Sequence, residues 1–212
     1  MKKIIILMCV FLFGWAGVAQ AEDEQPDALV KSAVQDVLAA IKQDKGKAES
    51  KKLMAVVDSE VLPLFDFTLM TKRAVGPAWK NATPEQKSKT VEEFRSLLIR
   101  AYISSKLVNL GDQQVTFEPL KIAPNDDQVD VKMLTTKTGE AAQDVIFTMK
   151  KTAAGWRVTD VKIFGSFVAK GVYSAQFEEQ IRQGGMDGLL KWLVDKNLAG
   201  NAKTAIRKVD AK

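Results

Sequence analysis

The sequence predicts one α+β domain, in which helices pack on a meandering antiparallel sheet. Apolar residues recur at helical spacing in the first and last parts of the chain. Between residues 115 and 164 they instead recur at every second position, as they do in half-buried strands. The order is therefore helices, then strands, then helices, with no internal repeat and no linker long enough to separate two domains.

The N-terminus carries the pattern of a cleavable secretory signal peptide. Lys2 and Lys3 precede an apolar run over residues 4–18, and Ala19-Gln20-Ala21 supplies the small-x-small cleavage pattern. The run of about 15 residues is short of the ~20 that span a bilayer, so a retained anchor is the less favoured alternative. We therefore expect residues 1–21 to be removed after Ala21 and the protein to be exported to the periplasm.

Cysteine usage and charge agree with that compartment. The only cysteine, Cys9, leaves with the signal, so the remaining chain has no disulfide. A domain of about 190 residues can bury roughly 70% of its unfolded surface without one, and exported proteins outside a bacterial periplasm are more often disulfide-stapled. The net charge falls from +5 to +3 on cleavage and is spread along the chain, which argues against nucleic acid as a partner.

The chain contains no histidine. This excludes Ser-His-Asp and Cys-His nucleophiles, histidine general bases and most zinc sites. No CxxC, P-loop or GxGxxG motif occurs either, so an enzyme would have to work with carboxylates, lysine or tyrosine alone. These absences agree with an expectation of no catalytic residue, no metal and no cofactor.

Helical periodicity predicts four segments before the sheet. They cover residues 27–44, a second helix around 53–57, a short helix after Pro63, and a long helix from 84 to about 109. The start of the long helix is the clearest local signal. Thr83 suits the N-cap, Pro84 the first helical position and Gln86 the third position of a capping box.

Four strand-like runs follow, at residues 115–120, 129–133, 145–150 and 156–164. Ala153-Ala154-Gly155 predicts a hairpin turn between the last two. In the last run the apolar positions change from even numbers to odd ones, which indicates either a β-bulge near Thr159-Asp160 or a strand that is covered on both faces.

The chain becomes helical again from Ser166 to Gly184-Gly185, and a final helix follows. Beyond Gly200 it is rich in lysine and poor in apolar residues, which predicts a disordered tail. The predicted organisation is a signal peptide over residues 1–21, an α+β domain over 22–198 and a tail over 199–212.

Three acidic sites are candidates for chemistry. Asp160 lies among apolar strand residues, so it is either a buried carboxylate of raised pKa that serves as a base, or a carboxylate that caps a helix or pairs with Arg157 or a lysine. Asp66 is ambiguous in the same way, as a helix N-cap or a base. Asn125-Asp126-Asp127 reads as a turn, because it lacks the alternating oxygens and closing glutamate of a calcium loop.

Large apolar side chains are concentrated where the long helix, the strands and the segment after Phe167 would face one another. Such a layer is either an ordinary core or an incompletely filled one that accepts an apolar ligand. Met133 and Met149 would suit ligands of variable shape, because methionine side chains are flexible and polarizable.

From about residue 28 to 197 the chain resembles the family of MlaC, also called the toluene-tolerance or ABC-transporter auxiliary family. The stretches that carry the resemblance are residues 61–67, 82–87 with Phe94, Leu98 and Tyr102 downstream, 155–161 running into Gly165-Ser166, and Phe177 followed by 185–189. After Gly165 the chain departs from the family pattern, because it lacks the Gly-Val-Ser-type turn and the arginine that follow in other members.

The resemblance implies a fold similar to nuclear transport factor 2 that encloses an apolar cavity. It also implies a periplasmic phospholipid carrier, with bound phospholipid as cargo, that maintains outer-membrane lipid asymmetry. Its partners would be an inner-membrane ABC transporter complex with an anchored substrate-binding subunit, and an outer-membrane lipoprotein–porin complex.

On this basis we expect the acyl chains to lie between a sheet wall and a helix wall, with the headgroup at the mouth. The expected lipid-binding residues are Phe94, Leu98, Tyr102, Val129, Val131, Met133, Val145, Phe147, Met149, Trp156, Val158, Phe167, Val168 and Val172. Alternatives are a carrier of hopanoid or another apolar ligand, an isomerase-like enzyme with Asp160 as its base, and an assembly partner with a solid core.

Overall fold

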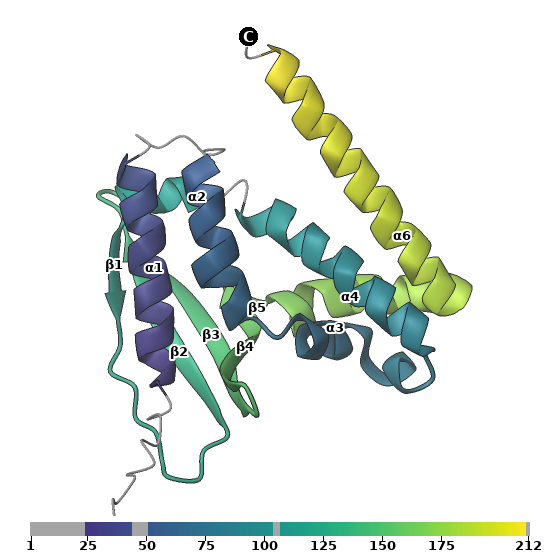
Figure 1. Cartoon of the computed structure of the whole chain (residues 1–212), viewed down its shortest axis with the longest axis horizontal. Coiled ribbons are helices and arrows are strands. Elements are labelled where there is room, and N and C mark those ends of the chain that lie inside the picture. Colours follow the sequence, from purple (N-terminus) through teal and green to yellow (C-terminus); the bar gives the residue numbers. More distant parts are fainter. Residues whose placement is uncertain (1–23, 44–50, 104–106, 211–212) are drawn as a thin grey trace, which may run out of the picture.

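A computed structural model describes residues 24–43, 51–103 and 107–210 (Figure 1). The predicted signal peptide, residues 1–21, lies outside these ranges. Over the described ranges, no helix is both long enough and apolar enough to cross a membrane.

Helical elements precede and follow one sheet. The first group is α1 (Pro26–Gln43), α2 (Lys51–Val56), the π-helical turn η1 (Val57–Val61), the 3₁₀ turn η2 (Leu62–Leu64), α3 (Phe67–Val75), η3 (Gly76–Lys80), α4 (Pro84–Leu98), the π-helical η4 (Ile99–Ile103) and η5 (Leu107–Asp112). The strands are β1 (Gln114–Phe117), β2 (Gln128–Thr136), β3 (Gln143–Thr152), β4 (Gly155–Ile163) and β5 (Ser166–Phe167). The π-helical η6 (Val168–Tyr173) and α6 (Ser174–Asp210) follow.

The predicted α+β class is confirmed. The strands pair in the order β1-β2-β3-β4-β5, and each neighbouring pair is antiparallel. Figure 1 shows α1 and α2 lying across the sheet, with α4 and α6 on the side of the molecule away from β1.

The predicted bulge in β4 is also confirmed. Asp160 pairs with Thr148 and Val158 pairs with Met149, so Thr159 is the extra residue. An inserted residue reverses the alternation of side chains beyond it. Val158 and Val161 are consequently buried on the same side of the sheet despite their odd spacing. The preceding hairpin turn lies at Ala153 and Ala154, as expected.

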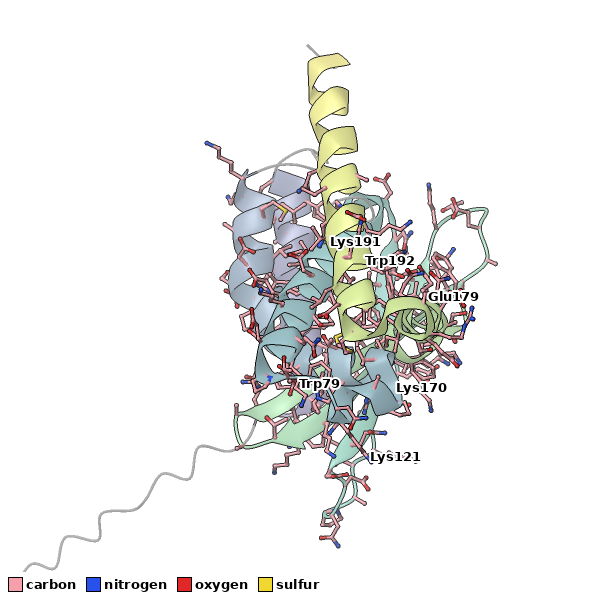
Figure 2. All side chains as sticks on the ribbon, turned by 90° about the vertical axis from the view of Figure 1, so that its right-hand side faces the viewer. Trp79, Lys121, Lys170, Glu179, Lys191 and Trp192 are labelled. Atoms are coloured by element: carbon pink, nitrogen blue, oxygen red, sulfur yellow. The ribbon has the colours of Figure 1, made fainter. Side chains whose placement is uncertain are left out.

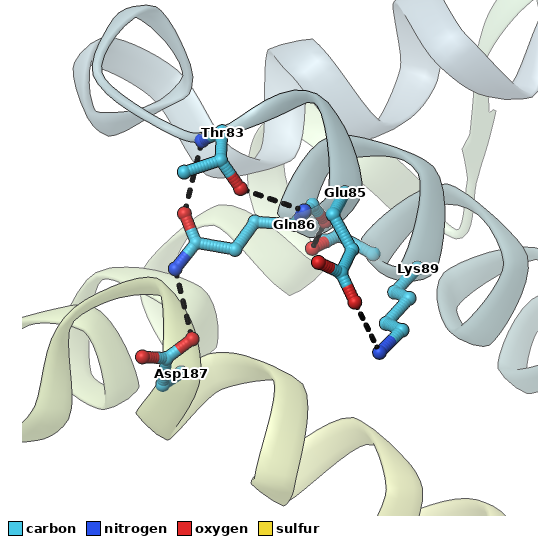
Figure 3. A network of polar contacts seen from close by, with 6 residues as sticks. Thr83, Glu85, Gln86, Lys89 and Asp187 are labelled. Carbon is cyan, nitrogen blue, oxygen red and sulfur yellow. Dashed lines mark hydrogen bonds and ion pairs between the residues drawn. The ribbon is translucent and has the colours of Figure 1, made fainter.

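The capping box at the start of α4 forms as predicted, and its Gln86 also contacts α6 (Figure 3). The Gln86 amide N–H donates to Thr83 Oγ1 at 3.1 Å, and the Thr83 N–H donates to Gln86 Oε1 at 3.0 Å. Gln86 Nε2 also donates to Asp187 Oδ1 of α6 at 2.8 Å. Two sequence stretches about a hundred residues apart are thereby joined.

Two boundaries differ from the prediction. The long helix ends as an α-helix at Leu98 and continues as the wider turn of η4, which brings both Leu98 and Ile99 toward the sheet. The structure continues α6 to Asp210, across the segment for which the sequence predicts a disordered tail. Alanine, lysine and arginine are frequent there and favour helix even without an apolar face. The expected break at Gly184 and Gly185 is present inside α6.

An aromatic cluster anchors the helices beside the sheet. Phe94 of α4 is fully buried and meets the rings of Tyr173 and Phe177 edge-on, each at a centroid distance of 4.9 Å. Phe177 in turn meets Trp192 of α6, which Figure 2 labels, at 6.0 Å. This part of the interior is closely filled.

Candidate functional site

A cavity of about 580 Å³ lies between the sheet and the helices that pack on it. This volume is within the range of pockets that enclose most of a small ligand's surface, about 300–1,000 Å³. Its wall consists of Val30, Ala33, Val34, Val37, Val61, Leu62, Leu64, Phe65, Phe67, Met70, Leu98, Ile99, Tyr102, Leu110, Asp112, Gln113, Met133, Thr135, Lys137, Glu140, Gln143, Val145, Phe147, Val158, Val161, Ile163, Phe164 and Val168.

The apolar part of this wall follows from the periodicity of its elements. On α1 the lining positions 30, 33, 34 and 37 form one helical stripe. On the sheet the wall is formed by alternate residues, such as Val145 and Phe147 of β3. Since both elements turn an apolar face inward without filling the space between them, the cavity interior is predominantly apolar.

The cavity is polar and open at one end. Its exposed lining residues are Asp112, Lys137, Glu140 and Phe164. Lys137 and Glu140 lie in the β2–β3 turn, Asp112 just precedes β1, and Phe164 directly follows β4. The strand register brings these three places to the same end of the sheet.

The charges at this opening are mixed. Lys137 Nζ lies 3.3 Å from Glu140 Oε1, and about half of each side chain is exposed. Exposed ion pairs contribute only about 0–1 kcal/mol, so this pair is easily exchanged for other partners. The opening therefore presents both signs of charge in front of an apolar interior.

Half of the fourteen residues expected to form the wall do line the cavity. They are Leu98, Tyr102, Met133, Val145, Phe147, Val158 and Val168. Their role in binding stays a prediction, since contact with the cavity is all that the structure adds.

The other seven do not line this cavity, and a role for them in lipid binding stays a prediction as well. They are Phe94, Val129, Val131, Met149, Trp156, Phe167 and Val172. One face of the sheet lines the cavity near the β2–β3 turn. Further along the strands, the same face packs against the filled core, where Val131 and Met149 are fully buried. Phe94 belongs to the aromatic cluster, and Val172 is 37% exposed.

The sequence-based expectation missed the contribution of two segments. The stripe on α1 and the run from Val61 to Met70 supply much of the wall. Both were visible as apolar patterns, but an apolar pattern has the same appearance whether it meets a core or a cavity.

Asp160 is placed as a capping carboxylate. It is 1% exposed, and its Oδ1 accepts from the amides of Val161 at 2.8 Å and Ala169 at 2.9 Å. Its Oδ2 accepts from the amide of Lys170 at 3.0 Å, so it satisfies the N-terminus of η6. Asp160 does not line the cavity.

The remaining acidic candidates are also local caps. Asp66 Oδ1 accepts from the amide of Leu69 at 2.8 Å, as the N-cap of α3. Asp126 Oδ2 accepts from the amide of Ala123 within the predicted turn. Among the residues that the structure describes, no cluster of three or more His, Cys, Asp or Glu residues is placed to hold a metal ion.

Two tyrosines border the cavity and the aromatic cluster. Burial raises the pKa of Tyr102, and burial together with the neighbouring Tyr102 raises the pKa of Tyr173 to about 12. Both hydroxyls therefore stay neutral near neutral pH, and Tyr102 adds no charge to the cavity wall.

The fold and the cavity define an α+β protein built to hold an apolar or amphipathic molecule with one polar end. Sequence comparison is more specific: the family model described as MlaC protein matches residues 31–195. The chain belongs to this family, as the resemblance predicts. No curated protein sequence matches it.

A solved structure agrees with this assignment. The phospholipid-binding protein from Ralstonia solanacearum, determined in complex with a phospholipid, is 35% identical to this chain. The match covers 84% of this chain and 99% of the Ralstonia protein, with a TM-score of 0.73.

Proposed function

We propose that this protein binds a diacyl phospholipid, with the acyl chains inside the cavity and the headgroup at the opening. The observation that carries the proposal is the cavity itself, which is apolar inside and lined by Asp112, Lys137 and Glu140 at its open end. The phospholipid held by the Ralstonia protein supports the same ligand class.

The energetics of the ligand explain why such a cavity is needed. Two acyl chains expose roughly 30 methylenes, and at ~0.8 kcal/mol each their transfer into water costs on the order of 24 kcal/mol. A cavity that matches the bilayer interior removes most of this cost at both ends of a transfer. Loading and release then both remain possible.

We further propose that the protein is a carrier and not an enzyme. It would move phospholipid through the periplasm between an inner-membrane ABC transporter complex and an outer-membrane lipoprotein–porin complex. The predicted export signal over residues 1–21 and the membership in the MlaC family support this role. Asp160, the candidate base, has both oxygens occupied by backbone amides outside the cavity.

Transfer between vesicles tests the carrier proposal. Donor vesicles containing a fluorescent phosphatidylethanolamine and a non-exchangeable quencher are mixed with plain acceptor vesicles, and dequenching is followed. The protein should raise the transfer rate in proportion to its concentration, because each molecule shields the acyl chains from water. A rate that stays at the protein-free value would contradict the proposal.

A further inference from the structure

One exposed aromatic residue adopts an unfavourable backbone conformation. Phe164 has a φ of +51° and is 65% exposed. It forms a two-residue turn with Gly165, whose φ is +77°, between the paired residues Ile163 and Ser166. Turns with two positive φ values favour Asn-Gly, and a bulky side chain in the first position is strained.

This strained turn lies at the open end of the cavity. Phe164 directly follows Ile163, a lining residue of β4, and itself lines the cavity at its open end. In the described part of the chain, the other exposed large apolar residues are Val172, Val194 and Leu198, and none of them lines the cavity. Phe164 thus combines exposure, strain and contact with the cavity.

We propose that Phe164 is a lipid-contact residue that extends the apolar wall beyond the end of β4. Its ring would cover the acyl-chain segment nearest the glycerol backbone, at the same end as Lys137 and Glu140, which lie at the level of the headgroup. This inference rests on the proposed function, because the ring lines the cavity that would hold the acyl chains. Local backbone strain is often retained at a binding site.

Three variants test the inference. Phe164→Asn removes the ring and suits the positive φ, whereas Phe164→Tyr keeps an aromatic ring. Leu198→Asn makes the same polar change on α6 at a residue of matched exposure, 62%, away from the cavity. Each protein is loaded with fluorescent phosphatidylethanolamine, and release to excess acceptor vesicles is timed. Thermal unfolding is measured on the unloaded proteins.

Phe164→Asn should release lipid about tenfold faster, the factor expected from losing about half the burial energy of a phenylalanine. Its melting temperature should rise by about 2–4 °C, because the strain is relieved. Phe164→Tyr and Leu198→Asn should release lipid at the wild-type rate.

Two results would overturn the inference while leaving the carrier intact. One is wild-type release by Phe164→Asn, and the other is faster release accompanied by a lower melting temperature, which would assign the ring to fold stability. If wild-type protein takes up no lipid at all, the proposed function fails and this inference fails with it.

Discussion

Phe147→Asp should abolish phospholipid retention while leaving the protein folded. Phe147 lies on β3 and lines the cavity, and its side chain is half-buried. A carboxylate there can stay hydrated while the cavity is empty, but a bound acyl chain would strip its water away. We expect affinity for phospholipid to fall at least about 100-fold, which corresponds to roughly 2.7 kcal/mol. Titration with a fluorescent phospholipid measures it.

Ile146→Asp is the matched control for this substitution. Ile146 is the adjacent residue of β3, is also half-buried, and does not line the cavity because side chains alternate across a sheet. It should bind lipid with near wild-type affinity. If the wild-type protein, Phe147→Asp and Ile146→Asp all bound phospholipid with equal affinity, the placement of the acyl chains in the cavity would be contradicted. Val131→Asp is unsuitable, since Val131 is fully buried outside the cavity and its replacement would disturb folding.

Asp160→Asn should be strongly destabilising. Both carboxylate oxygens accept backbone amides, from Val161 and Ala169 on one oxygen and from Lys170 on the other. An asparagine must turn its NH₂ toward one of these sets, where a donor then faces a donor. The loss of a buried charged acceptor predicts a reduction of about 2–4 kcal/mol in the free energy of unfolding. Urea denaturation measures this difference.

Asp66→Asn provides the comparison. Asp66 caps α3 through one oxygen only, and asparagine is an equally good N-cap, so its stability should change by less than about 0.5 kcal/mol. An Asp160→Asn protein as stable as wild type would show that the carboxylate is not needed as a cap. If that stable variant had also lost a pH-dependent turnover, the isomerase alternative would be favoured instead.

Local patterns in the sequence predict most of the fold. The capping box at Thr83 and Gln86 satisfies amides within one turn of helix, so no distant residue is needed to predict it. The bulge at Thr159 follows from the change in apolar parity along one strand. The fold class follows from the order of helical and alternating patterns.

The site is only partly predictable, for a physical reason. Alternation identifies the inward face of a strand, yet Met133 and Val131 share that face while only Met133 borders the cavity. Whether an inward residue meets a core or a void depends on what packs opposite, and the sequence does not display that. The positive φ of Phe164 is equally hidden, because phenylalanine is not a residue that signals such a turn.

The most direct test of a phospholipid-binding cavity is native mass spectrometry of the protein purified from cells, with no lipid added. The folded protein should carry a bound mass that collisional activation releases and that fragments as a diacyl phospholipid. The proposal would be contradicted if the protein showed no bound mass in the native spectrum and also took up no phospholipid from vesicles after purification. A bound hopanoid in place of the diacyl lipid would also contradict it and would reassign the ligand.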